Sequence, residues 1–160
     1  MIGFSAGGHL SAMTAAQPVD GKPAAADPLD RVSSRPDFLV LAYPWLEGTA
    51  VDPKGQSQYC MFAPTDCRPG DYERYQPTRF VTAKMPPTFI YHTTADSLVP
   101  AVGSLRFYEA LDAKKVPVEL HVFARGEHGS GLGGSDPALA RWPELLENWM
   151  RNLGLFNKKP

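Results

Sequence analysis

The chain has 160 residues, the length of one domain; 43% of them are hydrophobic and 21% charged, an ordinary globular composition that argues against intrinsic disorder. Sixteen basic and 17 acidic residues give a net charge of −1, so the chain lacks the basic surplus of a nucleic-acid or anionic-membrane binder. Its longest apolar run, residues 38–43, is too short to span a bilayer.

The first elements along the chain form a strand, a sharp turn and a helix. Residues 1–4 are typical of the last step of a buried strand. Small residues then predict a helix over residues 7–17, which Pro18, Gly21 and Pro23 terminate. Residues 18–36, rich in Pro, Ala, Asp and Arg, are expected to form a loop. Residues 1–20 lack a basic region followed by an apolar stretch, so no signal peptide is visible and the localisation stays open.

The middle of the chain combines a buried strand with an irregular segment. The apolar run 38–43, bounded by Pro36 and Pro44, is typical of a strand buried on both faces, as in a parallel sheet. Residues 44–80 hold both cysteines, several prolines and many aromatics without a clear period. We interpret this stretch as an irregular, cap-like insertion in a single domain that spans residues 1–160.

The rest of the chain alternates strands and helices. We expect strands at residues 88–92 and 118–123, and helices at residues 103–115 and 137–153, with a glycine-rich loop at 126–134. The alternating pattern of residues 118–123 indicates a strand near a sheet edge. This order predicts an α/β fold with three to four mostly parallel strands flanked by helices. Functional groups gather at the carboxyl ends of such strands, where Ser5, Asp96 and His128 fall.

The sequence Gly3-Phe4-Ser5-Ala6-Gly7 has the G-x-S-x-G pattern of a nucleophile elbow. In such an elbow a strained strand-to-helix turn exposes the serine, and the helix N-terminus directs N–H groups at the site. Because Gly3 and Gly7 lack Cβ atoms, we expect both to let the strand and the helix approach closely.

A serine hydroxyl needs a base, and His128 is the favoured candidate among the four histidines. It lies between glycines just past the last strand, in a loop that can reach a neighbouring strand end. His9 is expected to be a polar partner under the elbow, and His92 a core histidine or a residue that supports the site. His121 alternates with apolar residues and is expected to face solvent or pack on the sheet.

The imidazole in turn needs a carboxylate, and Asp96 follows the strand at 88–92 by a few residues. The alternative role for Asp96 is capping the next helix. Asp136 is expected to cap the last helix before Pro137, and Glu127 is expected to diverge from its neighbour His128. The order Ser5, Asp96, His128 is the order of the α/β-hydrolase triad.

Several segments together resemble the α/β-hydrolase esterases, and in particular the acetyl-xylan-esterase-like and feruloyl-esterase-like carbohydrate esterases. The resemblance covers nearly the whole chain apart from residues 44–80. The segments that carry it are residues 3–10 (GFSAGGHL), 86–100 (PPTFIYHTTADSLVP), 104–111 (SLRFYEAL), 116–123 (VPVELHVF) and 126–132 (GEHGSGL).

The resemblance implies a serine esterase that cleaves short acyl esters without a metal or another cofactor. Acyl groups on plant polysaccharides are one substrate class that it suggests. By position, Ser5 would be the nucleophile, His128 the general base, Asp96 the acid that orients it, and the N–H of Ala6 one oxyanion donor. The expected partner is a small-molecule or polysaccharide ester, with no nucleic acid and no membrane.

The position of the elbow departs from the family pattern. The family places it near mid-chain, whereas Ser5 lies at residue 5, so the chain resembles the C-terminal half of an esterase. The glycine-rich arm that supplies the second oxyanion donor has no counterpart here. Three explanations stay open: a truncated gene model, a fragment that needs a partner, or a homo-oligomer that completes the sheet.

Other readings also stay open. The elbow and the triad order fit a prolyl-oligopeptidase-like serine peptidase, and the missing arm fits a catalytically silent fragment. Cys60 and Cys67 are close enough in sequence for a loop-closing disulfide, but two free, buried cysteines are an equal alternative. The aromatics of the irregular segment either pack that segment or line an acyl or sugar pocket.

Overall fold

One parallel sheet organises the molecule. The computed structural model describes residues 1–47, 75–134 and 136–156. Within them four strands lie in the order β1-β2-β3-β4, and every neighbouring pair is parallel. The strands are β1 (Ile2–Phe4), β2 (Leu39–Ala42), β3 (Thr88–Thr93) and β4 (Val118–Phe123). The predicted parallel α/β architecture is therefore confirmed.

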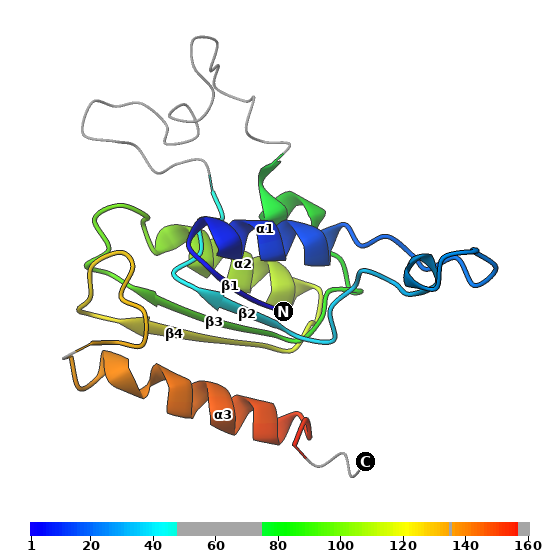
Figure 1. The fold of residues 1–160 in the computed structure, drawn as a ribbon. Helices are drawn as coiled ribbons and strands as arrows, with labels where there is room; N and C mark the ends of the chain where they lie inside the picture. Colours follow the sequence, from blue (N-terminus) through cyan, green and yellow to red (C-terminus); the bar gives the residue numbers. More distant parts are fainter. Residues whose placement is uncertain (48–74, 135, 157–160) are drawn as a thin grey trace, which may run out of the picture.

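Helices cover both faces of this sheet (Figure 1). The helices α1 (Ala6–Ala16) and α2 (Val102–Ala113) lie over one face, and α3 (Trp142–Asn152) lies under the other. Short 3₁₀ helices are η1 (Leu29–Arg31), η4 (Pro77–Phe80) and η5 (Leu139–Arg141). Among the described residues, every helix is too short or too polar to traverse a lipid bilayer.

The two faces of the sheet carry separate hydrophobic clusters. In β2, Leu39 and Leu41 join the cluster under α1 and α2, whereas Val40 and Ala42 join the cluster over α3. All four side chains are fully buried. Burial on both faces explains why this strand is a continuous apolar run in the sequence rather than an alternating one.

The two edge strands differ from the centre. All six residues of β3 are buried, whereas β4 is half-buried along most of its length, as expected of an edge strand. On the opposite edge, Ile2 and Phe4 of β1 are 53% and 40% exposed. The strand that leads to the predicted nucleophile is therefore short and partly exposed.

The final helix differs from the sequence prediction. The stretch expected to form one helix over residues 137–153 is divided into the 3₁₀ helix η5 and the α-helix α3. Pro143 stands in the first turn of α3. Because proline has no N–H to donate back to the preceding turn, an α-helix cannot run through it unbroken from residue 137, and it begins at Trp142 instead.

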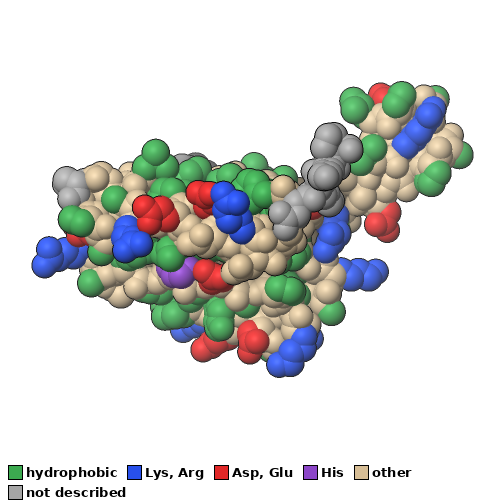
Figure 2. All heavy atoms as spheres, turned by 90° about the horizontal axis from the view of Figure 1, so that it is seen from below, with side chains coloured by type: hydrophobic (Ala, Val, Ile, Leu, Met, Phe, Trp, Pro, Cys, Tyr) green, Lys and Arg blue, Asp and Glu red, His purple; other side chains and the backbone are tan. Residues whose placement is uncertain are grey.

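The loop at residues 18–36 is built as an arm with its own hydrogen bonds. It projects from the body of the molecule in both views (Figures 1 and 2). Lys22 N–H donates to the Asp30 carbonyl, and Ser34 N–H donates to the Val19 carbonyl.

Figure 2 also shows that the face carrying α3 mixes acidic, basic and hydrophobic side chains.

Most of the irregular segment lies outside the described residues. The cap-like insertion was expected at about residues 44–80, of which the structure describes 44–47 and 75–80. Cys60 and Cys67 fall outside the described part, and so do the aromatics Tyr59, Phe62 and Tyr72.

Candidate active site

Ser5 occupies a strained turn between β1 and α1. Its backbone has φ 51° and ψ −121°, and a positive φ is rare for a residue with a side chain. Three backbone hydrogen bonds hold it: Ser5 N–H donates to the Ala42 carbonyl at 3.0 Å, and the N–H groups of His9 and Trp45 both donate to the Ser5 carbonyl at 3.2 Å. The turn is thus tied to the carboxyl end of β2, and it has the geometry that the G-x-S-x-G pattern indicates.

The close approach of β1 and α1 depends on Gly3 and Gly8, and this corrects the expectation for Gly7. A Cβ on Gly3 would lie 2.3 Å from the Gly7 carbonyl oxygen, and one on Gly8 would lie 2.7 Å from Cβ of Pro44. A Cβ on Gly7 would meet no atom of the described residues within 4 Å. The physical reason is that Gly7 faces outward on the first turn of α1, whereas Gly8 faces the chain that leaves β2.

Ser5, His128 and Asp96 are brought together at the carboxyl ends of the strands. Ser5 Oγ lies 2.7 Å from His128 Nε2, and His128 Nδ1 lies 2.8 Å from Asp96 Oδ2. An ionised carboxylate only accepts hydrogen bonds, so His128 Nδ1 donates to Asp96. His128 Nε2 then accepts from the Ser5 hydroxyl, which is the arrangement in which an imidazole can remove the serine proton.

Asp96 is an ionised carboxylate in a buried position. Its side chain is 0% exposed. Burial acts to raise the pKa of Asp96, but hydrogen bonds from His92, from Val99 N–H and from His128 outweigh it and lower the pKa to about 2. The carboxylate therefore keeps its negative charge at neutral pH, next to the ring that would become positive on taking a proton.

Asp96 does not cap α2, the role considered as its alternative, because the N-cap of α2 is Ala101 and no side-chain cap hydrogen bond is formed there. It closes a turn of its own instead. Oδ1 accepts from Leu98 N–H at 3.0 Å and from Val99 N–H at 2.7 Å, while Oδ2 faces His128. The two roles use different oxygens. The turn bonds to Oδ1 fix the orientation of the carboxylate and leave Oδ2 directed at the imidazole.

The loop that carries His128 is anchored at two of its carbonyls. Both the Tyr91 hydroxyl and Trp142 Nε1–H donate to the Gly131 carbonyl, at 2.7 Å and 3.0 Å. Burial raises the pKa of the Tyr91 hydroxyl above its usual range, so this group keeps the proton that it donates. A third bond, from Thr93 Oγ1 to the Gly126 carbonyl, ties the start of the loop to β3.

Tyr43 supports the His128 ring, and the sequence did not single it out for this role. The two ring centroids are 5.2 Å apart at 73°, an edge-to-face contact. Tyr43 follows β2 directly and has φ 37°, and it is buried. Its place at the carboxyl end of a buried strand was the available signal, because that is where Ser5 and Asp96 also lie.

His92 contacts the array, with Nε2 3.3 Å from Asp96 Oδ2, whereas His9, His121 and Glu127 lie apart from it. His9 Nε2–H donates to the Tyr75 carbonyl at 2.6 Å, and His121 pairs with Glu119 and packs against Phe89. Glu127 turns away from its neighbour His128, as expected, and accepts from the Ser97 hydroxyl at 3.0 Å.

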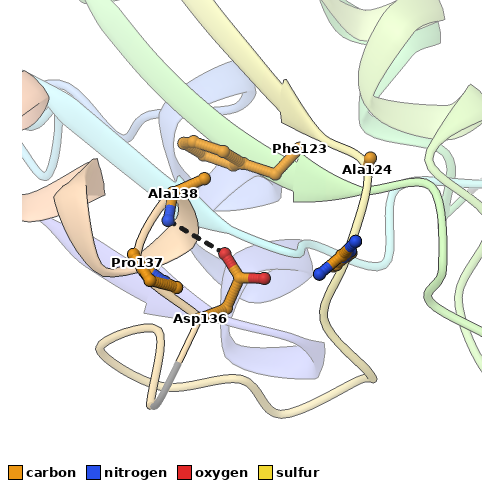
Figure 3. Close-up of a pocket in the computed structure, with 6 residues that line it drawn as sticks. Phe123, Ala124, Asp136, Pro137 and Ala138 are labelled. Atoms are coloured by element: carbon orange, nitrogen blue, oxygen red, sulfur yellow. Dashed lines mark hydrogen bonds between the residues drawn. The ribbon is translucent and has the colours of Figure 1, made fainter.

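A shallow cavity of about 300 Å³ lies beside β4 rather than at the triad (Figure 3). Asp136 forms part of its wall and caps the turn into η5, since its Oδ1 accepts from the N–H groups of Ala138 and Leu139. Asp136 was predicted to cap the last helix, but α3 begins at Trp142 with Arg141 as its N-cap, so Asp136 caps the turn that precedes it instead. None of Ser5, Asp96 and His128 lines this cavity, so we do not assign it to the site.

Comparison with known proteins identifies a family and a curated relative that this chain resembles. The model of the BD-FAE family matches residues 1–111. Endo-1,4-beta-xylanase B of Butyrivibrio fibrisolvens is 34% identical over 133 residues, which cover 81% of this chain and 20% of that protein.

Solved structures similar to this chain are hydrolases. An acetyl ester-xyloside bifunctional hydrolase from Caldicellulosiruptor lactoaceticus has a TM-score of 0.82 at 37% identity, over 96% of this chain and 56% of the other. The carboxylesterase Cest-2923 from Lactobacillus plantarum has a TM-score of 0.73 at 27% identity, over 96% and 58%. An α/β hydrolase from a Medee basin deep-sea metagenome library has a TM-score of 0.61 at 28% identity, over 94% and 52%.

The resemblance to the α/β-hydrolase esterases and the α/β-hydrolase fold class are confirmed by these matches. The chain spans a fifth of the curated relative and just over half of the similar solved chains.

Proposed function

The chain belongs to the BD-FAE family, and on that premise we propose that it carries the catalytic residues of a serine esterase acting on short-chain acyl esters. The observation that supports this most strongly is the unbroken hydrogen-bonded path from Ser5 through His128 to Asp96, with both links under 3 Å. Ser5 is the nucleophile, His128 the general base and Asp96 the group that orients the imidazole.

In the acylation step, Ser5 Oγ forms a bond to the carbonyl carbon of the ester while His128 Nε2 takes the hydroxyl proton. The imidazolium that results is stabilised by the buried, ionised Asp96. Collapse of the tetrahedral intermediate breaks the bond to the alcohol oxygen, which leaves with the proton held by His128. The product is an acyl ester on Ser5.

In the deacylation step, His128 takes a proton from water, whose oxygen attacks the acyl carbon. The bond to Ser5 Oγ breaks, and the proton on Nε2 returns to Ser5. The net reaction consumes one water and yields one carboxylic acid and one alcohol. A negative charge develops on the carbonyl oxygen in both steps, and Ala6 N–H is the proposed donor to it because Ala6 is the first residue of α1 and follows Ser5 directly.

Acetyl groups on plant polysaccharides are the proposed natural substrate class. The similar hydrolase from Caldicellulosiruptor lactoaceticus is named for acetyl-ester and xyloside substrates, and the similar protein from Butyrivibrio fibrisolvens is named a xylanase. A single domain over residues 1–160 is proposed as the unit that carries the three residues.

The experiment is p-nitrophenyl acetate hydrolysis by the purified chain and by Ser5→Ala. We expect Ser5→Ala to lose up to about 10⁶ in kcat, by analogy with other triads. Ser33→Ala, in the exposed arm, is the matched control and should keep the wild-type rate, because in the described part of the chain the Ser33 hydroxyl bonds to Val19 and Arg35 of the same arm. Acetylated xylan and a proline-containing peptide amide then separate esterase from peptidase activity.

A second experiment detects an activated serine even where ester hydrolysis by the chain is slow. An alkyl fluorophosphonate forms a stable phosphonyl ester on an activated serine and releases fluoride, and mass spectrometry locates the modified residue. Labelling at Ser5 supports the proposal. Undiminished turnover in Ser5→Ala, or a folded wild-type chain in which the reagent leaves Ser5 unmodified, would contradict it.

A further inference from the structure

Two imidazoles face the same oxygen of Asp96. His128 Nδ1 lies 2.8 Å from Oδ2, and His92 Nε2 lies 3.3 Å from the same atom. His92 comes from β3, four residues before Asp96, and is 0% exposed. It cannot reach a substrate from there, so a role for it must act through Asp96.

The protonation of the His92 ring follows from its neighbours. Nε2 faces two acceptors, the Val99 carbonyl at 2.9 Å and Asp96 Oδ2, so this nitrogen carries a proton. Nδ1 lies 2.8 Å from Oγ of Ser104, a fully buried residue of α2. With the proton on Nε2, His92 Nδ1 accepts a hydrogen bond from the Ser104 hydroxyl. Ser104 thereby complements the tautomer that donates toward Asp96.

The contacts form one continuous array that is longer than the proposed triad. It begins at α2 with Ser104, passes through His92 on β3 to Asp96, and continues through His128 to Ser5. Its first two members, Ser104 and His92, are fully buried and lie behind the carboxylate. Hydrogen bonds in such a chain polarise one another, so a change at Ser104 or His92 is felt at His128.

We propose that His92 is a positioning residue whose Nε2–H shares Oδ2 of Asp96 with His128 and moderates the pull of that carboxylate on the His128 proton, with Ser104 supporting this donation through its hydrogen bond to His92 Nδ1. The catalytic consequence rests on the proposed esterase function, whereas the array itself does not. His92 is among the hydrogen-bond donors that lower the pKa of Asp96, which is the direction that donation from Nε2 requires.

The titratable groups around the array limit what else could produce the effect. Among the described residues, the contacts on the His128 ring come from Ser5 after β1, Tyr43 after β2 and Asp96 after β3. Glu127 in the same loop is engaged by Ser97. Among these groups, His92 is thus the one whose hydrogen bond to Oδ2 can change how strongly this oxygen attracts the His128 proton.

The test is proton NMR of the low-field resonance of His128 Nδ1–H, with a titration of the His128 ring, in the full chain. In His92→Leu, Oδ2 loses one donor and attracts the His128 proton more strongly. We expect the resonance to move downfield and the midpoint of the His128 titration to rise by roughly half a pH unit, a fraction of one hydrogen bond. The acid limb of kcat/KM should move with it, while KM stays unchanged.

Three further variants make the result specific. His92→Gln keeps an N–H donor near the position of Nε2 and should recover most of the wild-type signal. Ser104→Ala weakens the donation from His92 and should shift the resonance in the same direction by a smaller amount; it also serves if His92→Leu does not fold. His121→Leu, on the neighbouring strand and outside the array, is the matched control.

The proposal is overturned if folded His92→Leu, or Ser104→Ala in its place, leaves the His128 resonance and titration at their wild-type positions. It is also overturned if His92→Gln shifts them as far as His92→Leu does. These readouts need no turnover. A chain without Ser5-dependent hydrolysis would therefore contradict the proposed function while the array is still judged by NMR.

Discussion

The two sides of the candidate site are built differently. Asp96 and His128 form an acid–base side: Asp96 follows the fully buried strand β3, the loop that carries His128 follows β4 and is tied to β3, and side-chain hydrogen bonds fix both residues. Ser5 forms a nucleophile side, which is held in a strained backbone conformation by backbone hydrogen bonds and close glycine packing.

This difference predicts how each side fails. The acid–base side depends on charge and donor placement, so substitutions there should change rates and pH dependence while the fold persists. The nucleophile side depends on backbone geometry, so substitutions that surround Ser5, as distinct from Ser5→Ala itself, should act through stability. The following changes, ordered from the largest expected effect to the smallest, separate the two sides.

Asp96→Asn should have the largest effect of these changes, second to Ser5→Ala, and should act on rate. The amide can donate to His128 Nδ1 and so favours the wrong tautomer, which in other triads costs about 10⁴ in kcat. The turn bonds to Oδ1 remain available to the amide oxygen, so the fold should persist. Ester hydrolysis and circular dichroism check both points; wild-type kcat in a folded Asp96→Asn variant would refute the role of Asp96.

Gly3→Ala should act on stability instead. The new Cβ would lie 2.3 Å from the Gly7 carbonyl oxygen and 2.5 Å from Ser11 Oγ, so β1 and α1 must separate. Overpacking of this kind costs about 1–3 kcal/mol in the free energy of unfolding. Denaturant unfolding measures it.

Gly7→Ala is the matched control for that change, because a Cβ there meets no atom of the described residues within 4 Å. It should leave the unfolding free energy within about 1 kcal/mol of wild type. Equal destabilisation by Gly3→Ala and Gly7→Ala would contradict the packing account of the elbow.

The acid–base side should also give the fold a pH dependence that the nucleophile side lacks. The pKa of Asp96 is lowered from 3.8 to about 2 in the folded protein, so its contribution to stability is present above pH 4 and is lost as the pH falls toward 2. The contribution is about 2 kcal/mol. The free energy of unfolding should therefore decrease more between pH 5 and pH 2.5 in wild type than in Asp96→Asn. An equal decrease in both would disprove this contribution of Asp96.

Tyr43→Leu should have a smaller effect, and on kcat. It removes the ring that meets His128 edge-to-face, a contact worth about 0.5–1.5 kcal/mol, so kcat should fall about three- to tenfold. Tyr43→Phe keeps the ring and serves as the control. If both variants lose the same activity, the hydroxyl rather than the ring contact matters.

Ser97→Ala should have the smallest effect. The hydroxyl donates to Glu127 at the exposed rim between the loops that carry Asp96 and His128. Because both partners are exposed, we expect a change below about 0.5 kcal/mol in stability and less than threefold in kcat. A larger loss would mean that this contact, and not the buried array, holds the two loops together.

The sequence was sufficient for features that depend on neighbouring residues. The apolar runs predicted β2 and β3, and the alternation of residues 118–123 predicted an edge strand. The G-x-S-x-G spacing indicated the turn that Ser5 adopts. Each of these features is decided by backbone preference or by burial within a few residues, so a linear pattern contains it.

The tertiary structure decided which side chains share an environment. Gly8 rather than Gly7 is pressed by Pro44, and the Tyr43 ring lies against His128. His92 and Ser104 meet behind Asp96, although they belong to a strand and a helix that are separate in the sequence. The physical reason is that parallel strands bring distant residues to one edge of the sheet, where contacts depend on register and side-chain direction that no single segment specifies.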